Sequence, residues 1–223
     1  MTESGAFLFD WDGTLVDTGD VLLSCWHQMT ERVLGYPFPV EESDRRKYLA
    51  MRASESFPTL SDDPAVVRQL FVEFDLAYAA KAPEHVRAQD DAAALLMHLR
   101  SRGRVGVVTS KTAVRFRIDA AATGLADAFD IIVTGDDVAR GKPDPEGITH
   151  ALTTLGCDPA ASWYIGDGPV DIRAGRAAGV RTIGISHGLH SVEELTAESP
   201  DALVSSLSEA QRVLDQETTG GRP

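Results

Sequence analysis

Six short apolar runs, separated by longer stretches with helical periodicity, constrain the fold of this chain more than any other feature. The runs are Phe7–Phe9, Val105–Val108, Ile131–Val133, Trp163–Ile165, Thr182–Ile185 and Ala202–Val204. Each is typical of a buried strand. Helical patterns lie between the later runs, at Asp91–Arg100, Thr112–Ala122 and Pro145–Leu155. This alternation predicts a parallel sheet with helices on both faces, which is a three-layer α/β/α core.

The first two apolar runs are separated by a long interval that has helical patterns and no strand pattern of its own. The predicted helices there are Asp20–Leu34, Pro64–Ala80 and a shorter piece near Glu42–Met51. Several helices without strands indicate an α-helical insert, which we place at residues 16–83. The core domain then consists of residues 1–15 and 84–223.

The charge of the chain limits its partners. The formal net charge is −13, and no basic block compensates for it. We therefore expect no nucleic-acid partner, because a polyanion would be repelled overall. A small anionic substrate is compatible with this charge where a metal ion or a lysine reverses the field locally.

The cellular location is predicted from what the sequence lacks. No apolar run approaches the ~20 residues of a membrane helix, and the N-terminal residues show no basic region followed by an apolar stretch. Cys25 and Cys157 are the only cysteines, and their spacing fits no disulfide framework. We expect both to be buried as small apolar residues in a cytoplasmic protein without membrane contact.

Side chains that could take part in catalysis or binding follow the predicted strands. They are Asp10 and Asp12 after the first run, Thr109 and Ser110 after the second, Lys142 in "GKPDP", and Asp167 and Asp171 in "GDGPVD". The carboxyl ends of parallel strands meet at one edge of a sheet, so these residues are expected to converge on one site.

This set of residues fits phosphoryl transfer. Clustered carboxylates suit Mg²⁺, which prefers oxygen ligands. A lysine and a hydroxyl can hold phosphoryl oxygens. One aspartate could attack phosphorus, and a second, two residues further on, could protonate the leaving alcohol and later deprotonate water.

Four segments resemble a known family. "DWDGTLVDT", "VVTSK", "GKPDP" and "IGDGPVDIRAGRAAGV" are similar, in this order, to the four motifs of the haloacid dehalogenase-like phosphohydrolases. The resemblance is to the branch that contains phosphoglycolate phosphatase and β-phosphoglucomutase. It implies a Rossmann-like core, and the helical insert resembles the C1-type cap of that branch.

The resemblance implies roles for the four aspartates. Asp10 corresponds to the nucleophile and to a Mg²⁺ ligand. Asp12 corresponds to the general acid and base, and its main-chain carbonyl to a further metal ligand. Asp167 corresponds to another metal ligand. Asp171 follows it closely in sequence and is included in the expected metal-binding set.

The resemblance also implies a phosphate-binding set. Thr109 and the amide of Ser110 would hold the phosphoryl group, beside Gly13, and Lys142 would pair with the nucleophile and the phosphate. Arg52 lies in a charged stretch of the cap. That stretch forms either a solvated face or a contact to the distal group of the substrate when the cap closes.

Several positions depart from the motifs or allow two interpretations. Trp11 stands where an aliphatic residue is more usual, and strand alternation directs its ring away from the aspartates, so we expect no effect on the chemistry. Ser110 stands where asparagine is common. Lys111 is either a solvated helix start or a charge at the edge of the site. Asp144 is better explained as a helix N-cap than as a catalyst, and His187 and His190 as structural.

The function predicted from these observations is a Mg²⁺-dependent phosphatase that acts on a small phosphorylated metabolite through an aspartyl-phosphate. Phosphoglycolate, a sugar phosphate, pyrophosphate and an intermediate of specialised metabolism are all compatible substrates. A phosphotransferase similar to β-phosphoglucomutase is the alternative, because it keeps the same motifs. A non-catalytic binding protein on the same scaffold ranks below both. The chain is expected to be a monomer or a homodimer.

Overall fold

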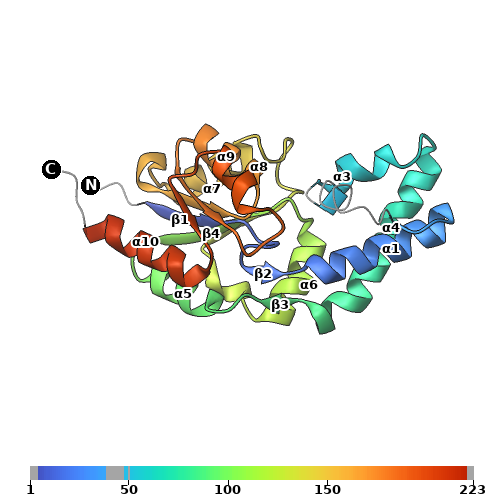
Figure 1. Ribbon diagram of the computed structural model, residues 1–223, viewed down its shortest axis with the longest axis horizontal. Helices are drawn as coiled ribbons and strands as arrows, with labels where there is room; N and C mark the ends of the chain where they lie inside the picture. The colour runs from blue at the N-terminus through green and yellow to red at the C-terminus, as the bar shows by residue number, and fades with distance from the viewer. Residues whose placement is uncertain (1–4, 39–47, 50, 220–223) are drawn as a thin grey trace.

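A parallel six-stranded sheet forms the centre of the molecule (Figure 1). The computed structural model describes residues 5–38, 48–49 and 51–219. The strand order is β5-β4-β1-β6-β7-β8. The strands are β1 (Ala6–Phe9), β4 (Arg104–Val108), β5 (Ile131–Val133), β6 (Trp163–Gly166), β7 (Arg181–Ile185) and β8 (Ala202–Val204). They contain the six apolar runs of the sequence, and the predicted fold class is confirmed.

The register of the sheet brings the ends of its central strands level with one another. Phe9, the last residue of β1, pairs with Val107 of β4 and with Ile165 of β6. The amide of Asp10 then donates to the carbonyl of Ile165 at 2.8 Å. The residues that follow these strands therefore emerge side by side at the C-terminal edge.

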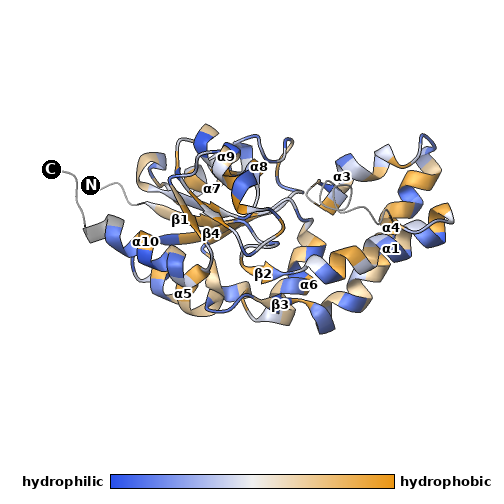
Figure 2. Cartoon of the chain, viewed as in Figure 1, coloured by the Kyte–Doolittle hydropathy of each residue, from blue (hydrophilic) through white to orange (hydrophobic). Residues whose placement is uncertain are grey.

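Alternation along β1 divides the core into two halves. Phe7 and Phe9 face the side covered by α5 (Ala92–Arg100) and α10 (Leu207–Thr219). Ala6 and Leu8 face the side of α7 (Glu146–Leu155) and α8 (Pro169–Ala177). The strands carry apolar residues and lie between these helices (Figures 1 and 2). Such two-sided burial is typical of parallel sheets.

The remaining elements of the core are short or lie at its margins. Helix α6 (Ala113–Thr123) packs against the helix α4 described below, and α9 (Val192–Ala197) packs against α8. The 3₁₀ turns are η2 (Ala126–Ala128) and η3 (Pro159–Ala161).

The helical insert lies beyond one end of the sheet (Figure 1). Its elements are α1 (Gly19–Leu34), α3 (Ala53–Ser56), η1 (Phe57–Thr59) and α4 (Pro64–His85). The helices α1 and α4 pack against each other. The ring of Trp26 lies at their centre, 4.6 Å from the ring of Phe38 and 5.1 Å from that of Phe57. This apolar cluster holds the insert together.

An antiparallel strand pair joins the insert to the core. It consists of β2 (Val16–Asp17) and β3 (Arg87–Ala88). We propose that the segment between them is the cap, with limits close to the predicted residues 16–83. The predicted helical piece near Glu42–Met51 lies largely outside the described residues.

Helix α7 begins one residue later than the sequence predicts. Asp144 was expected to be the N-cap, but the helix begins at Glu146 and Pro145 occupies the cap position. Pro145 adopts helical dihedral angles, with φ −74° and ψ −2°, which shifts the boundary by one residue. The Asp144 carboxylate still accepts a hydrogen bond from the Glu146 amide at 3.0 Å, so it keeps a capping role.

In the part of the chain that the structure describes, none of the helices combines the length and the apolar character of a membrane span.

Candidate active site

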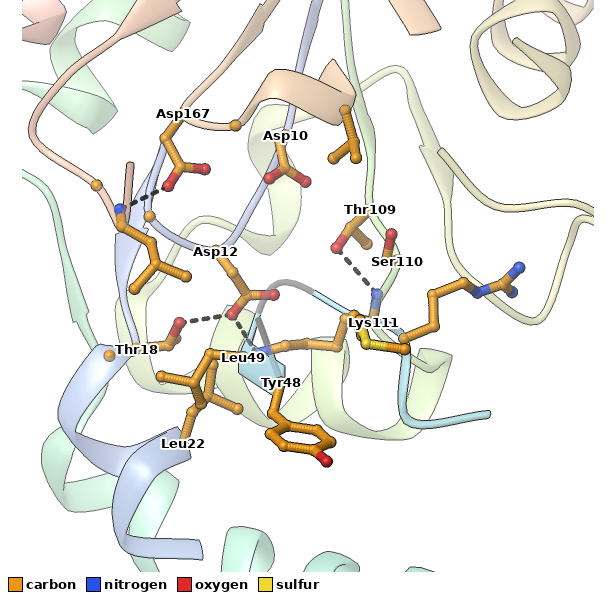
Figure 3. Close-up of a pocket in the computed structure, with 18 of the residues that line it drawn as sticks. Asp10, Asp12, Thr18, Leu22, Tyr48, Leu49, Thr109, Ser110, Lys111 and Asp167 are labelled. Atoms are coloured by element: carbon orange, nitrogen blue, oxygen red, sulfur yellow. Dashed lines mark hydrogen bonds and ion pairs between the residues drawn. The ribbon is translucent and has the colours of Figure 1, made fainter. Parts of the chain in front are cut away.

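A cavity of about 300 Å³ lies between the C-terminal edge of the sheet and the cap. It is lined by every residue for which the sequence predicts a role in the site. These are Asp10, Asp12, Gly13, Arg52, Thr109, Ser110, Lys142, Asp167 and Asp171. Segments that lie up to 161 residues apart in the chain thus meet at one place, as the topology of a parallel sheet requires. Figure 3 shows the part of this cavity around Asp10 and Asp12.

Three carboxylates and one ammonium form the buried centre of the site. One oxygen from each of Asp10, Asp167 and Asp171 lies within 4.8 Å of the others. Lys142 Nζ lies 2.7 Å from Asp10 Oδ1 and 2.6 Å from Asp171 Oδ1. The cluster therefore holds more negative than positive charge in a place with little access to water.

The pKa values in this centre reflect that crowding. Burial raises the pKa of Asp10 to about 7, with Lys142 opposing the shift and Asp171 adding to it. Burial and the neighbouring Asp10 and Asp171 carboxylates hold the pKa of Asp167 well above its usual value. Burial alone would lower the pKa of Lys142, but the attraction of Asp10 and Asp171 outweighs it and holds the pKa well above the usual range. A divalent cation would relieve this excess of negative charge, and the all-oxygen donor set suits Mg²⁺.

Asp171 and Asp167 are held in place by different partners. Asp171 Oδ1 accepts from Lys142, and its Oδ2 accepts from the Gly168 amide at 2.9 Å, so this carboxylate orients the lysine. Asp167 Oδ2 accepts from the Leu189 amide at 2.8 Å, which leaves its other oxygen directed toward Thr14 at 3.5 Å. Asp167 is therefore the freer of the two to bind a metal ion.

The carboxylate of Asp12 lies apart from the three-carboxylate cluster. Its Oδ1 accepts from the Thr18 hydroxyl at 2.6 Å and lies 2.7 Å from Lys111 Nζ (Figure 3). The Asp12 side chain is 28% exposed, against 10% for Asp10. The Asp12 carboxylate is therefore not one of the three carboxylates that could hold a metal ion together. A metal contact through its main-chain carbonyl stays a prediction of the resemblance.

The predicted phosphate-binding residues surround the same centre. Thr109 is buried, and its Oγ1 accepts from the Lys111 amide at 3.1 Å. Ser110 is half-buried at the cavity wall (Figure 3). Gly13 has a φ of +75°, and a Cβ there would lie 2.4 Å from Asp167 Oδ2. Only glycine permits both the backbone turn and the close approach of this aspartate.

Arg52 reaches from the cap to the core. Its Nη2 donates to the carbonyl of Gly135 at 2.6 Å, and its side chain lies over Gly141. The residue lines the cavity, so its guanidinium is not part of a fully solvated face. This position is compatible with a contact to the far end of a bound substrate.

Other residues at the site have weak or ambiguous signals in the sequence. Thr18 follows Asp12 by six positions inside "DWDGTLVDT", and only its hydroxyl could have signalled a contact. The interpretation of Lys111 as a solvated helix start is wrong, since its side chain is 3% exposed. His187 lines the cavity and its Nε2 lies 3.0 Å from the Thr14 carbonyl, which is consistent with a structural role. Cys25 and Cys157 are buried and unpaired, as predicted.

The fold and the site define the class of protein: an α/β enzyme with an acidic centre at the C-terminal edge of its sheet, under a helical cap. The family described as haloacid dehalogenase-like hydrolase matches residues 7–185. The chain therefore belongs to the haloacid dehalogenase-like hydrolases.

Two curated relatives illustrate the match. The pyrophosphatase PpaX of Bacillus velezensis is 29% identical over 205 residues, which cover 92% of this chain and 93% of that protein. The phosphoglycolate phosphatase of Nitrosococcus oceani is 30% identical over 216 residues, covering 94% of this chain and 96% of that protein.

Solved structures show the same fold. A crystal structure from Bacteroides fragilis, described as a haloacid dehalogenase-like hydrolase, aligns with a TM-score of 0.82 at 29% identity. It covers 93% of this chain and 100% of that one. A hydrolase from Pseudomonas syringae aligns with a TM-score of 0.82 at 24% identity, covering 95% of this chain and 98% of that one.

Proposed function

We propose that this protein is a Mg²⁺-dependent phosphatase that hydrolyses a small phosphorylated metabolite through an aspartyl-phosphate intermediate. The observation that supports it most is the division between two aspartates on one strand end. Asp10 is buried in the carboxylate cluster beside Lys142. Asp12 is more exposed and is held by Thr18 and Lys111. The two carboxylates thus have environments suited to different tasks.

In the first half of the proposed reaction, an oxygen of Asp10 bonds to phosphorus and the bond from phosphorus to the leaving oxygen breaks. Asp12 donates a proton to that oxygen, so the leaving oxygen departs protonated, as an alcohol when the substrate is a phosphate monoester. In the second half, Asp12 takes a proton from water as the water oxygen attacks phosphorus. The bond from Asp10 to phosphorus then breaks, which releases phosphate and restores the carboxylate.

The remaining residues of the site stabilise the charge that develops on the phosphoryl oxygens. Lys142 supplies an ammonium held in place by Asp171, and Thr109 and the amide of Ser110 supply hydrogen bonds. Mg²⁺ would be held by Asp10, Asp167 and the main-chain carbonyl of Asp12, with Asp171 adjoining, and would neutralise negative charge on the phosphoryl group when bound.

The substrate class follows in part from the relatives and in part from Arg52. Pyrophosphate and 2-phosphoglycolate, suggested by the names of the two relatives, each carry a second anionic group. Arg52 lies on the cap side of the cavity and is the residue that we assign to that group. A guanidinium can bind either a carboxylate or a phosphate.

The test is phosphate release by the purified protein from pyrophosphate, 2-phosphoglycolate, a panel of sugar phosphates and p-nitrophenyl phosphate, with Mg²⁺ and with EDTA. We expect release that requires Mg²⁺ and that is lost in Asp10→Asn. The matched control is Asp144→Asn, which changes a carboxylate outside the catalytic set and should keep activity. Full activity of Asp10→Asn would refute the mechanism.

The same experiment separates the alternatives. Accumulation of a sugar bisphosphate in place of free phosphate would support a phosphotransferase similar to β-phosphoglucomutase. Absence of turnover with every substrate, with and without Mg²⁺, would support a non-catalytic binding protein. We also propose a cytoplasmic location, which the two unpaired buried cysteines support.

A further inference from the structure

Lys111 contacts the Asp12 carboxylate, which we assign as general acid and base. Its Nζ lies 2.7 Å from Asp12 Oδ1, the same oxygen that accepts from Thr18 (Figure 3). The Lys111 side chain is 3% exposed, whereas lysines usually keep their ammonium in water. A lysine buried beside Asp12 does not serve to keep the surface soluble, so its position needs another explanation.

The ammonium of Lys111 contacts three polar groups. It donates to the carboxylate of Asp119 and to the hydroxyl of Tyr78, whose oxygen lies 2.6 Å away, and it forms an ion pair with Asp12. An ammonium has three donors and no acceptor, so three such neighbours match its capacity. The direction of the Lys111 side chain is thereby determined.

Asp119 in turn is held on both of its oxygens. It is fully buried in α6, and its Oδ1 accepts from the Tyr78 hydroxyl at 2.7 Å. Its Oδ2 accepts from Lys111 and from the indole N–H of Trp11 at 3.1 Å. A buried carboxylate with every neighbour donating to it is a rigid anchor.

Trp11 gives this network a direct connection to the nucleophile strand. Strand alternation does point its ring away from Asp10 and Asp12, and the ring packs 4.7 Å from that of Phe116. The indole N–H nevertheless donates to Asp119, which accepts from Lys111, and Lys111 in turn contacts Asp12. The residue that separates the two catalytic aspartates in sequence therefore helps to support one of them from behind.

We propose that Lys111 is a positioning residue for Asp12, fixed in place by Asp119, Trp11 and Tyr78. Thr18 and Lys111 hold one oxygen of Asp12, which leaves the other oxygen free to reach the leaving group. This inference rests on the proposed function, because it assumes that Asp12 transfers the proton. Tyr78 lies on α4 of the cap, so the cap contributes to the arrangement of the acid.

The competing explanation is that the network only fastens α4 to α6. The two explanations differ in their dependence on the leaving group. An alkyl phosphate needs a proton on its departing oxygen, while the p-nitrophenolate of p-nitrophenyl phosphate departs without one. Misplacing Asp12 should therefore slow the first substrate much more than the second, whereas a loss of stability slows both equally.

The experiment compares kcat/KM for propyl phosphate and p-nitrophenyl phosphate, together with Tm, in three variants of this network, in one control variant and in Asp12→Asn. The ratio kcat/KM reports the formation of the aspartyl-phosphate. We expect Lys111→Met to lower it about tenfold or more for propyl phosphate and by less than about threefold for p-nitrophenyl phosphate. Tyr78→Phe and Trp11→Phe should shift it in the same direction by about threefold, since each removes one donor and keeps an aromatic ring.

The control variant is Thr30→Val. It removes a buried cap hydroxyl that donates to the Trp26 carbonyl at 3.0 Å, away from Asp12. It should lower Tm and leave the ratio of the two substrates unchanged. If the kcat/KM for propyl phosphate relative to that for p-nitrophenyl phosphate is unchanged in Tyr78→Phe and Lys111→Met, the positioning role is overturned. An unchanged ratio in Asp12→Asn would instead refute the proposed proton transfer, and with it this inference.

Discussion

The hydroxyl of Tyr78 donates a 2.7 Å hydrogen bond to Asp119, and this bond joins the cap helix α4 to the core helix α6. A second polar contact links the same two helices, since Arg115 Nε lies 2.7 Å from Asp75 Oδ1. The cap is therefore attached to the core by specific contacts and not by apolar packing alone. One of these contacts continues, through Lys111, to the carboxylate of Asp12.

Asp12→Asn should remove most of the activity and little of the stability. The amide cannot donate and then recover a proton, so phosphate release should fall by about 100-fold or more. An amide oxygen can still accept from Thr18, so the fold should persist. Phosphate release and Tm measured on the same sample check this, with Asp20→Asn on the exposed face of α1 as the control.

Gly13→Ala should weaken Mg²⁺ binding as well as the fold. The added Cβ would lie 2.4 Å from Asp167 Oδ2 at a φ of +75°, so Asp167 must move. We expect a loss of about 1–2 kcal/mol in stability and a higher Mg²⁺ concentration for half-maximal activity. Gly35→Ala is the matched control, with a φ of +77° and no atom within 4 Å of the new Cβ. An equal effect of both variants on the Mg²⁺ requirement would contradict this assignment of Asp167.

Asp167→Asn should raise the stability of the metal-free protein while it abolishes activity. Burial and the repulsion from Asp10 and Asp171 disfavour the ionised carboxylate, so a neutral amide should add on the order of 1 kcal/mol in EDTA. Chemical denaturation in EDTA measures this. Asp201→Asn is the contrast, because the Asp201 carboxylate accepts from the Thr182 amide at 2.8 Å and should lose stability. A less stable Asp167→Asn would count against a strained carboxylate cluster.

Arg52→Ala should raise KM selectively. If the guanidinium binds the second anionic group of a substrate, KM for 2-phosphoglycolate or pyrophosphate should rise about tenfold. KM for p-nitrophenyl phosphate, which lacks such a group, should change little. Arg68→Ala, at an exposed position of α4, controls for the loss of positive charge from the cap. Equal changes for all substrates would argue for a role in holding the cap closed.

Thr134→Val should destabilise the protein in a pH-dependent way. The hydroxyl and amide of Thr134 donate to Asp137 at 2.6 Å and 2.8 Å, and these bonds lower the pKa of Asp137. A lowered folded-state pKa gives stability that is present above the unfolded value of 3.8 and is lost as the pH falls through the folded value. The cost of the substitution, about 1 kcal/mol at pH 7, should therefore shrink below about pH 3. Urea denaturation at several pH values measures it, and a constant cost would contradict the assignment.

The sheet and the main site residues could be predicted because their signals are local. Each strand is a short apolar run, and its periodicity needs only a few neighbouring residues. Asp10 and Thr109 directly follow such runs, and the rule that parallel strands end at one edge places them together. The start of α7 was displaced by one residue because Pro145 can occupy either the cap or the first turn.

The network behind Asp12 was not predictable in this way. Lys111 meets Asp119 across eight positions, Tyr78 across 33 and Asp12 across 99, and none of these separations is a motif. The sequence predicts no effect of Trp11 on the chemistry, because its ring faces away from the aspartates. Strand alternation cannot show that its indole N–H donates to Asp119. The sequence by itself determined the strands, their polar ends and the place of the proposed nucleophile, since these depend on local periodicity and chain direction. Only the tertiary structure decided which buried donors support the acid, because that depends on how α4 and α6 pack.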